Sequence, residues 1–351
     1  MNRWEESLIL YKKRYYNLDL IKVVASILIV FHHYQQTSGA VFNGINFFGG
    51  DFYWGYLVEL FFVISGFVMA ASNNQEKSII RRFVGKCIRI YPGTILACTV
   101  AIVIAYTGYF LHGEFQSTSV DYMNIGTIIT SYTLTFCGWC FDMGLGINNP
   151  TWYLCVLLLC YIIYYVIEFI SQKVRVSKDV FYIFIFGVSF VAYYLEKTLP
   201  WFFTYQSLRG YIGFFLGVLL HDLIVTRFSD EKIRVIVLGL ALLTALGTWL
   251  LGIGSWGVLI LFLYPTLVLL AVSVKQVSAK VSYLAVVSYE IYLWHGPCLS
   301  LLSLIGYTGG IQMTHSYFTM ILFTVFVCLV SALIYRWYEV PVTRWLRLKL
   351  E

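Results

Sequence analysis

The sequence has 351 residues, of which 60% are hydrophobic, 19% aromatic and only 12% charged, and its net charge is +6. Soluble domains average about 25% charged residues, so this composition excludes a soluble globular protein and indicates a polytopic membrane protein. The Lys and Arg residues flank apolar segments instead of forming one basic patch, which argues against a nucleic-acid-binding protein.

Ten apolar segments have close to the ~20 residues that a helix needs to cross a bilayer. We predict an all-α polytopic membrane bundle of about ten transmembrane helices, at residues 19–36, 53–72, 91–110, 151–170, 180–196, 206–221, 234–252, 256–274, 284–304 and 316–338. The sequence contains no internal repeat and no second soluble domain, so residues 18–340 are expected to form one membrane-embedded domain.

The basic residues also orient the chain in the bilayer. If the N-terminus lies inside, all but two of the 24 Lys and Arg residues fall in inner segments, the exceptions being Lys197 and Arg209. Positive charge is enriched on the cytoplasmic side of membrane proteins. We therefore predict that residues 1–17 and 341–351 form cytoplasmic terminal segments.

The first predicted helix carries ionisable side chains where a simple anchor would be apolar. They are Asp19, Lys22, His32 and His33, and an ionisable group in a bilayer costs roughly 2.5–3.5 kcal/mol on insertion scales. Lys22 and His33 are close to three helical turns apart, about 16 Å along the axis. Both therefore project from nearly the same side of the helix, which predicts a path or a site reached from both sides of the membrane.

Glu59 is the only charged residue of the second predicted helix. A carboxylate that bonds one imidazole nitrogen fixes the histidine tautomer and raises its basicity, so we expect His32 or His33 as the partner. The alternative is a neutral Glu59 that hydrogen-bonds a neighbouring helix and serves packing alone.

A basic stretch precedes the third predicted helix. It contains five cations: Lys77, Arg81, Arg82, Lys86 and Arg89. Such a stretch commonly sets topology and contacts lipid headgroups, which is the simpler interpretation. The alternative is a clamp for a phosphate-rich cytoplasmic ligand, because Arg side chains bind phosphate oxygens through a planar fork.

Residues 111–150 are predicted to form one long outer connection, with an interfacial or re-entrant helix near 124–138. A full span at residues 122–140 would move three cations to the outer side, namely Lys173, Arg175 and Lys178. The same connection contains Cys137 and Cys140. A disulfide, two ordinary thiols or, with few other ligands nearby, a zinc site are the open alternatives for this pair.

Four further residues are candidates for holding a substrate. Trp152 and Tyr153 begin the fourth predicted helix, where aromatic residues either form the interfacial belt or stack against a sugar. Arg209 is a cation on the side where cations are rare, and is a candidate for holding an anionic or polar group. His295 is rotated by about 140° from Glu290 on the ninth helix and is either a structural or gating histidine or part of a site.

Together these motifs resemble those of the acyltransferase-3 family, integral membrane enzymes that modify sugars of bacterial surface glycans. The resemblance covers nearly the whole chain through six short motifs in the same order: residues 18–25 with the later His33, 57–67, 86–92, the helix that starts at Trp152, 288–295 and, in degraded form, 335–341. There are two departures. Lys22 stands where the family usually has Arg, and residues 156–158 are apolar where many members have a Glu.

The resemblance implies transfer of an acyl group, most often acetyl, from cytoplasmic acyl-CoA to a sugar hydroxyl of a surface polysaccharide or glycolipid, at the inner membrane of a bacterium. His33 is then expected to act as the general base, oriented by Glu59. The residues expected to hold the coenzyme A phosphates are Lys22, Arg82, Lys86 and Arg89. The residues expected to bind the acceptor are Trp152, Tyr153, Arg209 and His295.

Acyl-CoA is expected as a donor substrate and not as a permanently bound cofactor, and no metal site and no nucleic-acid partner are expected. The alternative function is a transporter or flippase of a glycan or lipid-linked intermediate, which would explain buried charges but predicts inverted repeats with paired broken helices. The sequence leaves open the acceptor, the acyl group, the choice between direct transfer and an acyl-enzyme, and the oligomeric state.

Overall fold

The computed structural model describes residues 14–72, 78–113, 124–139, 146–198, 201–278, 281–309 and 315–350. The structure is 82% helical, and these ranges contain no strand. Eight of the helices described are long and apolar enough to cross a membrane. The prediction of an all-α polytopic membrane protein is therefore confirmed.

The helices follow one another as α2 (Tyr16–Ser38), α3 (Leu57–Ala71), α4 (Ile79–His112), α5 (Ile125–Thr133), α6 (Trp152–Val174), α7 (Lys178–Tyr194), α8 (Tyr205–Leu219), α9 (Asp230–Leu251), α10 (Trp256–Val258), α11 (Tyr264–Ser273), α12 (Val281–Gly309), α13 (Tyr317–Ile334) and α14 (Val340–Leu350). Short π-helical segments extend α8 and join two pairs of helices, α10 to α11 and α13 to α14. They are Leu220–Val225, Leu259–Leu263 and Tyr335–Glu339.

All ten predicted spans are helical, but two of them are not among the eight that length and composition mark as membrane spans. One is α7, which has only 17 residues. The other is α12, whose apolar character is diluted by Glu290, His295 and several Ser and Tyr residues. That α7 and α12 cross the bilayer, and the inside location of both termini, stay predictions.

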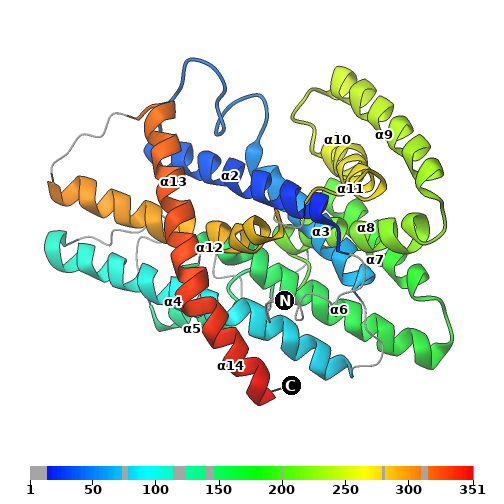
Figure 1. The fold of residues 1–351 in the computed structure, drawn as a ribbon, viewed down its shortest axis with the longest axis horizontal. Coiled ribbons are helices and arrows are strands. Elements are labelled where there is room, and N and C mark those ends of the chain that lie inside the picture. Colours follow the sequence, from blue (N-terminus) through cyan, green and yellow to red (C-terminus); the bar gives the residue numbers. More distant parts are fainter. Residues whose placement is uncertain are drawn as a thin grey trace.

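Three long helices form the middle of the bundle. α12 packs along both α2 and α4, and the continuous α13–α14 rod crosses this group, with α13 on α2 and α12 and α14 on α4 (Figure 1). α9 lies at the edge of the molecule against α11 (Figure 1). Only Ile233 and Val237 of α9 are buried, so most of this apolar helix is available to lipid.

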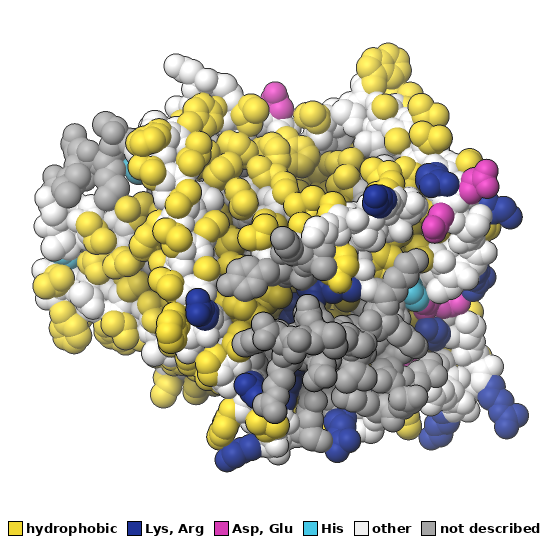
Figure 2. Space-filling model, in the orientation of Figure 1, with side chains coloured by type: hydrophobic (Ala, Val, Ile, Leu, Met, Phe, Trp, Pro, Cys, Tyr) yellow, Lys and Arg dark blue, Asp and Glu magenta, His cyan; other side chains and the backbone are white. Residues whose placement is uncertain are grey.

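The surface has the polarity that a bilayer requires. Hydrophobic side chains cover much of the left and upper centre of the face seen in Figure 2, and Lys and Arg gather toward its lower and right edges. Large apolar side chains such as Trp249 and Phe318 are among the most exposed. A contiguous apolar surface of this extent is typical of contact with lipid.

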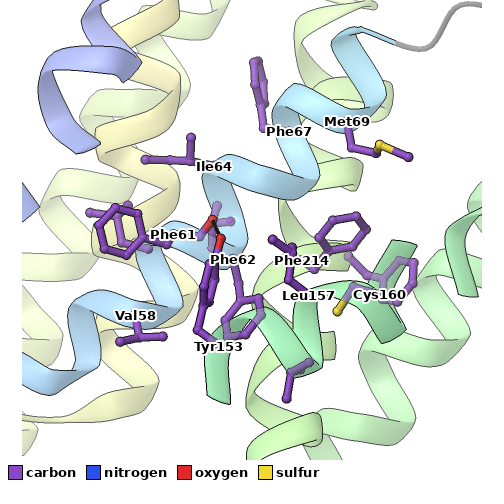
Figure 3. Packing of buried hydrophobic residues seen from close by; sticks show 14 of the residues in the cluster. Val58, Phe61, Phe62, Ile64, Phe67, Met69, Tyr153, Leu157, Cys160 and Phe214 are labelled. Atoms are coloured by element: carbon purple, nitrogen blue, oxygen red, sulfur yellow. Dashed lines mark hydrogen bonds between the residues drawn. The ribbon is translucent and has the colours of Figure 1, made fainter. Parts of the chain in front are cut away.

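The hydrophobic core is centred on α3. Its buried side chains point to several sides of the helix and pack in one cluster with Tyr153 and Leu157 of α6 and Phe214 of α8 (Figure 3). The polar side chains of α3 are Glu59 and Ser65. The packing therefore fixes the depth at which these two polar groups lie in the bundle.

α3 and α8 approach each other backbone to backbone. A Cβ atom added at Gly217 of α8 would lie only 1.9 Å from the carbonyl oxygen of Val63 on α3. Small residues permit such close helix contacts in membrane proteins. The same contact brings Arg209, at the start of α8, against Glu59 of α3, a pairing of two elements far apart in the sequence.

The described part of the predicted outer connection folds back against the bundle. α5 has nine residues, too few for a span, and it lies where a short helix was predicted. Tyr91 of α4 donates a hydrogen bond to the Thr133 carbonyl oxygen at 3.0 Å, and Trp139 donates to that of Cys155 at 3.0 Å. Cys137 is buried. The disulfide and the zinc site predicted as alternatives for Cys137 both require Cys140, which lies outside the described residues.

Candidate active site

A cavity of about 130 Å³ opens between α2, α3, α4, α6 and α12. Three cations line it, Lys22, Lys86 and Arg89, together with polar side chains that include Ser65, Tyr153 and Tyr292. We call this the basic cavity. It combines positive charge with tyrosine and aliphatic walls, a lining suited to a ligand that is anionic at one end and extended at the other.

The three cations of the basic cavity differ in their partners. Lys22 Nζ lies 2.7 Å from Asp19, which also pairs with Arg14 at 2.9 Å. Lys86 lies over the ring of Tyr161, 5.3 Å from its centroid. Within the described chain neither Lys86 nor Arg89 forms an ion pair. Neither cation is held at ion-pair distance by a carboxylate of the described residues.

Arg82 does not line the basic cavity. Its guanidinium forms a bidentate ion pair with Glu168 of α6, with Nη1–Oε2 and Nη2–Oε1 distances of 2.9 and 3.1 Å, and lies over Tyr165. The structure therefore does not support the expected role of Arg82 beside Lys86 and Arg89. The sequence could not reveal this, because Glu168 is more than eighty positions away.

His33 lies on the outer half of α2 with its ring turned into the bundle. Its Nδ1 is 2.9 Å from Gln36 Oε1, and its ring stacks on that of His295 with centroids 5.0 Å apart and 23° between the planes. When Nδ1–H donates to this amide oxygen, Nε2 is left as the basic nitrogen. This is the tautomer that a general base at Nε2 requires.

His32 and His33 are adjacent, and the structure separates their roles. His32 is buried, and its Nδ1 lies 2.7 Å from the carbonyl oxygen of Phe47 in the loop that follows α2. Its ring also meets Tyr53 edge-on, 5.0 Å away. His32 therefore fastens this loop, whereas His33 faces His295.

Two tyrosines connect the basic cavity with the histidine pair. Tyr153 and Tyr292 both line the cavity, and their ring centroids are 5.6 Å apart. Tyr292 is also 5.8 Å from the ring of His295, one helical turn further along α12. Tyr153 is held by Ser65, with 2.9 Å between the two hydroxyl oxygens. The aromatic contacts thus run from the cavity to His33.

Glu59 is fully buried, and its partner is not a histidine. Arg209 Nε lies 2.6 Å from Glu59 Oε1, and Trp256 Nε1 donates to the same oxygen at 2.9 Å. The prediction that Glu59 pairs with His32 or His33 is therefore wrong. Glu59 neutralises a buried cation, and Gln36 takes the orienting position that was expected of it.

Aromatic rings enclose this ion pair at the predicted outer side. Arg209 lies over Trp152 and Tyr205, 5.0 and 5.7 Å from their centroids. Trp256 stacks on Tyr193 at 4.1 Å, and the Tyr193 and Tyr205 hydroxyl oxygens are 3.0 Å apart. We call Trp152, Tyr193, Tyr205 and Trp256, with the enclosed pair, the outer aromatic mouth. Of the four residues expected to bind the acceptor, Trp152 and Arg209 meet here. Tyr153 and His295 lie instead in the line of aromatic contacts between the basic cavity and His33.

The acyltransferase-3 family model, an acyltransferase domain, matches residues 15–336. The chain belongs to the acyltransferase-3 family. No curated protein and no solved structure matches the sequence. The family and the apolar helices together make this protein a multi-pass membrane acyltransferase, as the motifs predicted.

In this acyltransferase, a short segment positions His295 in a way that the sequence did not indicate. Asn148 Nδ2 donates to the Leu293 carbonyl oxygen at 2.9 Å, and the Tyr292 hydroxyl donates to that of Pro150. A Cβ at Gly296 would lie 2.5 Å from Asn148 Oδ1. Gly296 thus lets the start of α6 dock on α12 beside His295, and α12 continues through Gly296 and Pro297.

Two carboxyl groups of the acyltransferase converge near Gly93 of α4. A Cβ at this glycine would lie 3.2 Å from Glu339 Oε2 and 3.7 Å from Glu290 Oε1. Both oxygens are buried without a hydrogen-bond partner in the described chain. Glu339 is buried and directs its Oε2 toward α4, although Arg336 and Arg344 flank it in the sequence.

Proposed function

We propose that this acyltransferase moves an acyl group, acetyl in the first instance, from cytoplasmic acyl-CoA to a hydroxyl of a sugar in a bacterial surface polysaccharide or glycolipid. The observation that supports this proposal is the line of contacts from the basic cavity through Tyr153 and Tyr292 to the stacked His295 and His33. In this proposal it joins the site of a polyanionic donor to a base nearer the predicted outer side of the membrane-embedded domain.

The donor site in this proposal is the basic cavity. Lys22, Lys86 and Arg89 would bind the phosphates of coenzyme A, because charge-assisted hydrogen bonds to phosphate oxygens are strong. The pantetheine arm would extend along the tyrosine-lined wall toward His33. Lys22 and His33 are about 16 Å apart along α2, a distance that this arm roughly matches.

In the proposed transfer step, His33 acts as the base through its unprotonated Nε2. Its Nε2 takes the proton of the sugar hydroxyl while the hydroxyl oxygen forms a bond to the thioester carbonyl carbon. The carbon–sulfur bond then breaks, and the thiolate of coenzyme A leaves and receives the proton back from the imidazolium. Gln36 fixes the tautomer, and the stacked His295 holds the plane of the ring.

The test compares surface glycans from cells with the wild-type gene, without it, and with His33→Ala. Mass analysis should detect an acyl substituent that the wild type adds and that His33→Ala reduces by about 100- to 10,000-fold, the usual contribution of a general base. Acyl-CoA binding to the purified variant should persist, because His33 does not line the basic cavity.

His112→Ala is the matched control, since this histidine lies at the end of α4 against Tyr307. It should acylate as the wild type does. Full acylation by His33→Ala would contradict the proposed base, and glycans that do not differ with and without the gene would contradict the proposed acceptor class.

A further inference from the structure

We propose that the outer aromatic mouth selects an acceptor sugar residue that carries no net charge, and that it disfavours uronic acids, sialic acids and phosphorylated sugars. This inference rests on the proposed function and names the substrate class of its acceptor site. It comes from the way the structure uses Arg209, the one cation of the mouth.

The charge of Arg209 is already neutralised inside the protein. Its Nε is 2.6 Å from Glu59 Oε1, and the side chains of Arg209 and Glu59 are 12% and 0% exposed. The guanidinium also lies over both Trp152 and Tyr205. A carboxylate or phosphate binds Arg through charge-assisted hydrogen bonds, and here Glu59 already occupies that role.

The ion pair as a whole has no net charge, so it offers an anionic sugar no net attraction. Glu59 Oε2 is buried and has no hydrogen-bond partner in the described chain. A carboxylate or phosphate brought against these aromatic rings would lose part of its hydration and gain no net positive charge in return, which is costly for a charged group. The pair therefore works against anionic acceptors.

The surrounding surface does not supply the missing positive charge. Among described residues on the predicted outer side, the remaining cation is Lys197. Two negatively charged residues, Asp51 and Glu196, lie on the same side and offset its charge. All three are exposed. Screening by salt limits the reach of such exposed charges to about 10 Å. No net positive field is therefore expected over the mouth.

The rings themselves suit a neutral sugar. Trp and Tyr offer flat apolar faces together with N–H and O–H groups, which match the C–H face and the hydroxyls of a pyranose. Tyr53 adds a ring beside the histidines, 5.0 Å from that of His32.

The first experiment locates the acyl group in the glycan. Glycans from cells with and without the gene are cut into single sugar units, and tandem mass spectrometry assigns the unit that loses its acyl group. Loss from a neutral unit is expected. Loss from a unit that carries a carboxylate or phosphate would overturn the inference but leave the proposed function intact, whereas no loss from any unit would refute the proposed function itself.

The second experiment changes the charge of the mouth. Glu59→Gln keeps an amide oxygen for Arg209 and Trp256 but leaves the cation unneutralised. With the acceptor identified above and its uronic acid analogue, the ratio of kcat/KM for the anionic over the neutral acceptor should rise about tenfold or more, equivalent to 1.4 kcal/mol.

The double variant Glu59→Gln/Arg209→Gln is the control, because it removes both charges and restores neutrality. It should keep the wild-type preference for the neutral acceptor. It also decides the matter if the single variant fails to fold, since replacing a whole buried ion pair is far less costly than breaking it. An unchanged ratio in a folded Glu59→Gln, or a gain of anionic acceptors by the double variant, would overturn the inference.

Discussion

The basic cavity and the outer aromatic mouth both hold cations beside tyrosine rings, yet their charges are arranged differently. In the cavity, Lys86 and Arg89 have no ion-pair partner within the described chain. In the mouth, Arg209 is bound to Glu59 at 2.6 Å. We therefore expect Arg209, which is buried and paired, to serve structure, and Lys86 and Arg89 to be open to a ligand. Lys22, which lines the cavity and is paired with Asp19, combines both features. The residue type alone does not distinguish these cases.

The largest effect is expected from Arg209→Met, which leaves the charge of Glu59 buried and uncompensated. Breaking a buried ion pair typically costs about 3–5 kcal/mol. Thermal unfolding of the protein in detergent or nanodiscs should show the loss, and Lys197→Met, at an exposed position, should not. A variant as stable as the wild type would mean that the pair is not structural.

Lys86→Gln and Arg89→Gln test the other side of the comparison. Each removes a cation without an ion-pair partner in the described chain, so the free energy of unfolding should change by less than about 1 kcal/mol. Acyl-CoA affinity should fall by about 10- to 100-fold, because hydrogen bonds to charged groups contribute about 1.5–3 kcal/mol. Calorimetric titration with acetyl-CoA measures this.

Arg82→Gln should behave in the opposite way to those two variants. It breaks the bidentate pair with Glu168, so stability should fall while acetyl-CoA affinity stays within about twofold of the wild type. Weakened acetyl-CoA binding by Arg82→Gln, at unchanged stability, would return this residue to the donor site.

The glycine contact that assembles the mouth gives a further test. Gly217→Ala places a Cβ 1.9 Å from the Val63 carbonyl oxygen, and such overpacking costs about 1–3 kcal/mol. Gly239→Ala on α9 meets nothing within 4 Å and should be neutral or slightly stabilising, because Ala favours helix over Gly. Equal melting temperatures for the two variants would contradict the close approach of α3 and α8.

The smallest effect is a difference in salt dependence between the two regions. Raising ionic strength screens charge–charge contacts. Acyl-CoA affinity should therefore fall several-fold between low and high salt, while KM for the neutral acceptor stays nearly constant. Parallel salt dependence for both substrates would indicate that the mouth, like the cavity, binds through net charge.

Much of the helical framework could be predicted from the sequence, because each span carries its own apolar length and its own flanking charges. The shared face of Lys22 and His33 also followed from helical spacing. The partners of Glu59 and Arg82 could not be predicted, since the close approach of α8 to α3 and the packing of α6 on α4 bring together residues more than eighty positions apart. The contact of Gln36 with His33 could have been predicted, because residues three apart on one helix are neighbours.

The edge-to-face contact of Tyr153 with Tyr292 has a consequence for the cell that contains this enzyme. On the proposed reaction, these two phenols stand between a compartment with activated thioesters and one that has none. A closed contact of this kind would let the acyl group pass from coenzyme A to the acceptor while coenzyme A itself stays on the inner side. Glycans outside the membrane could thus be acylated with thioesters made inside the cell, without an open pore.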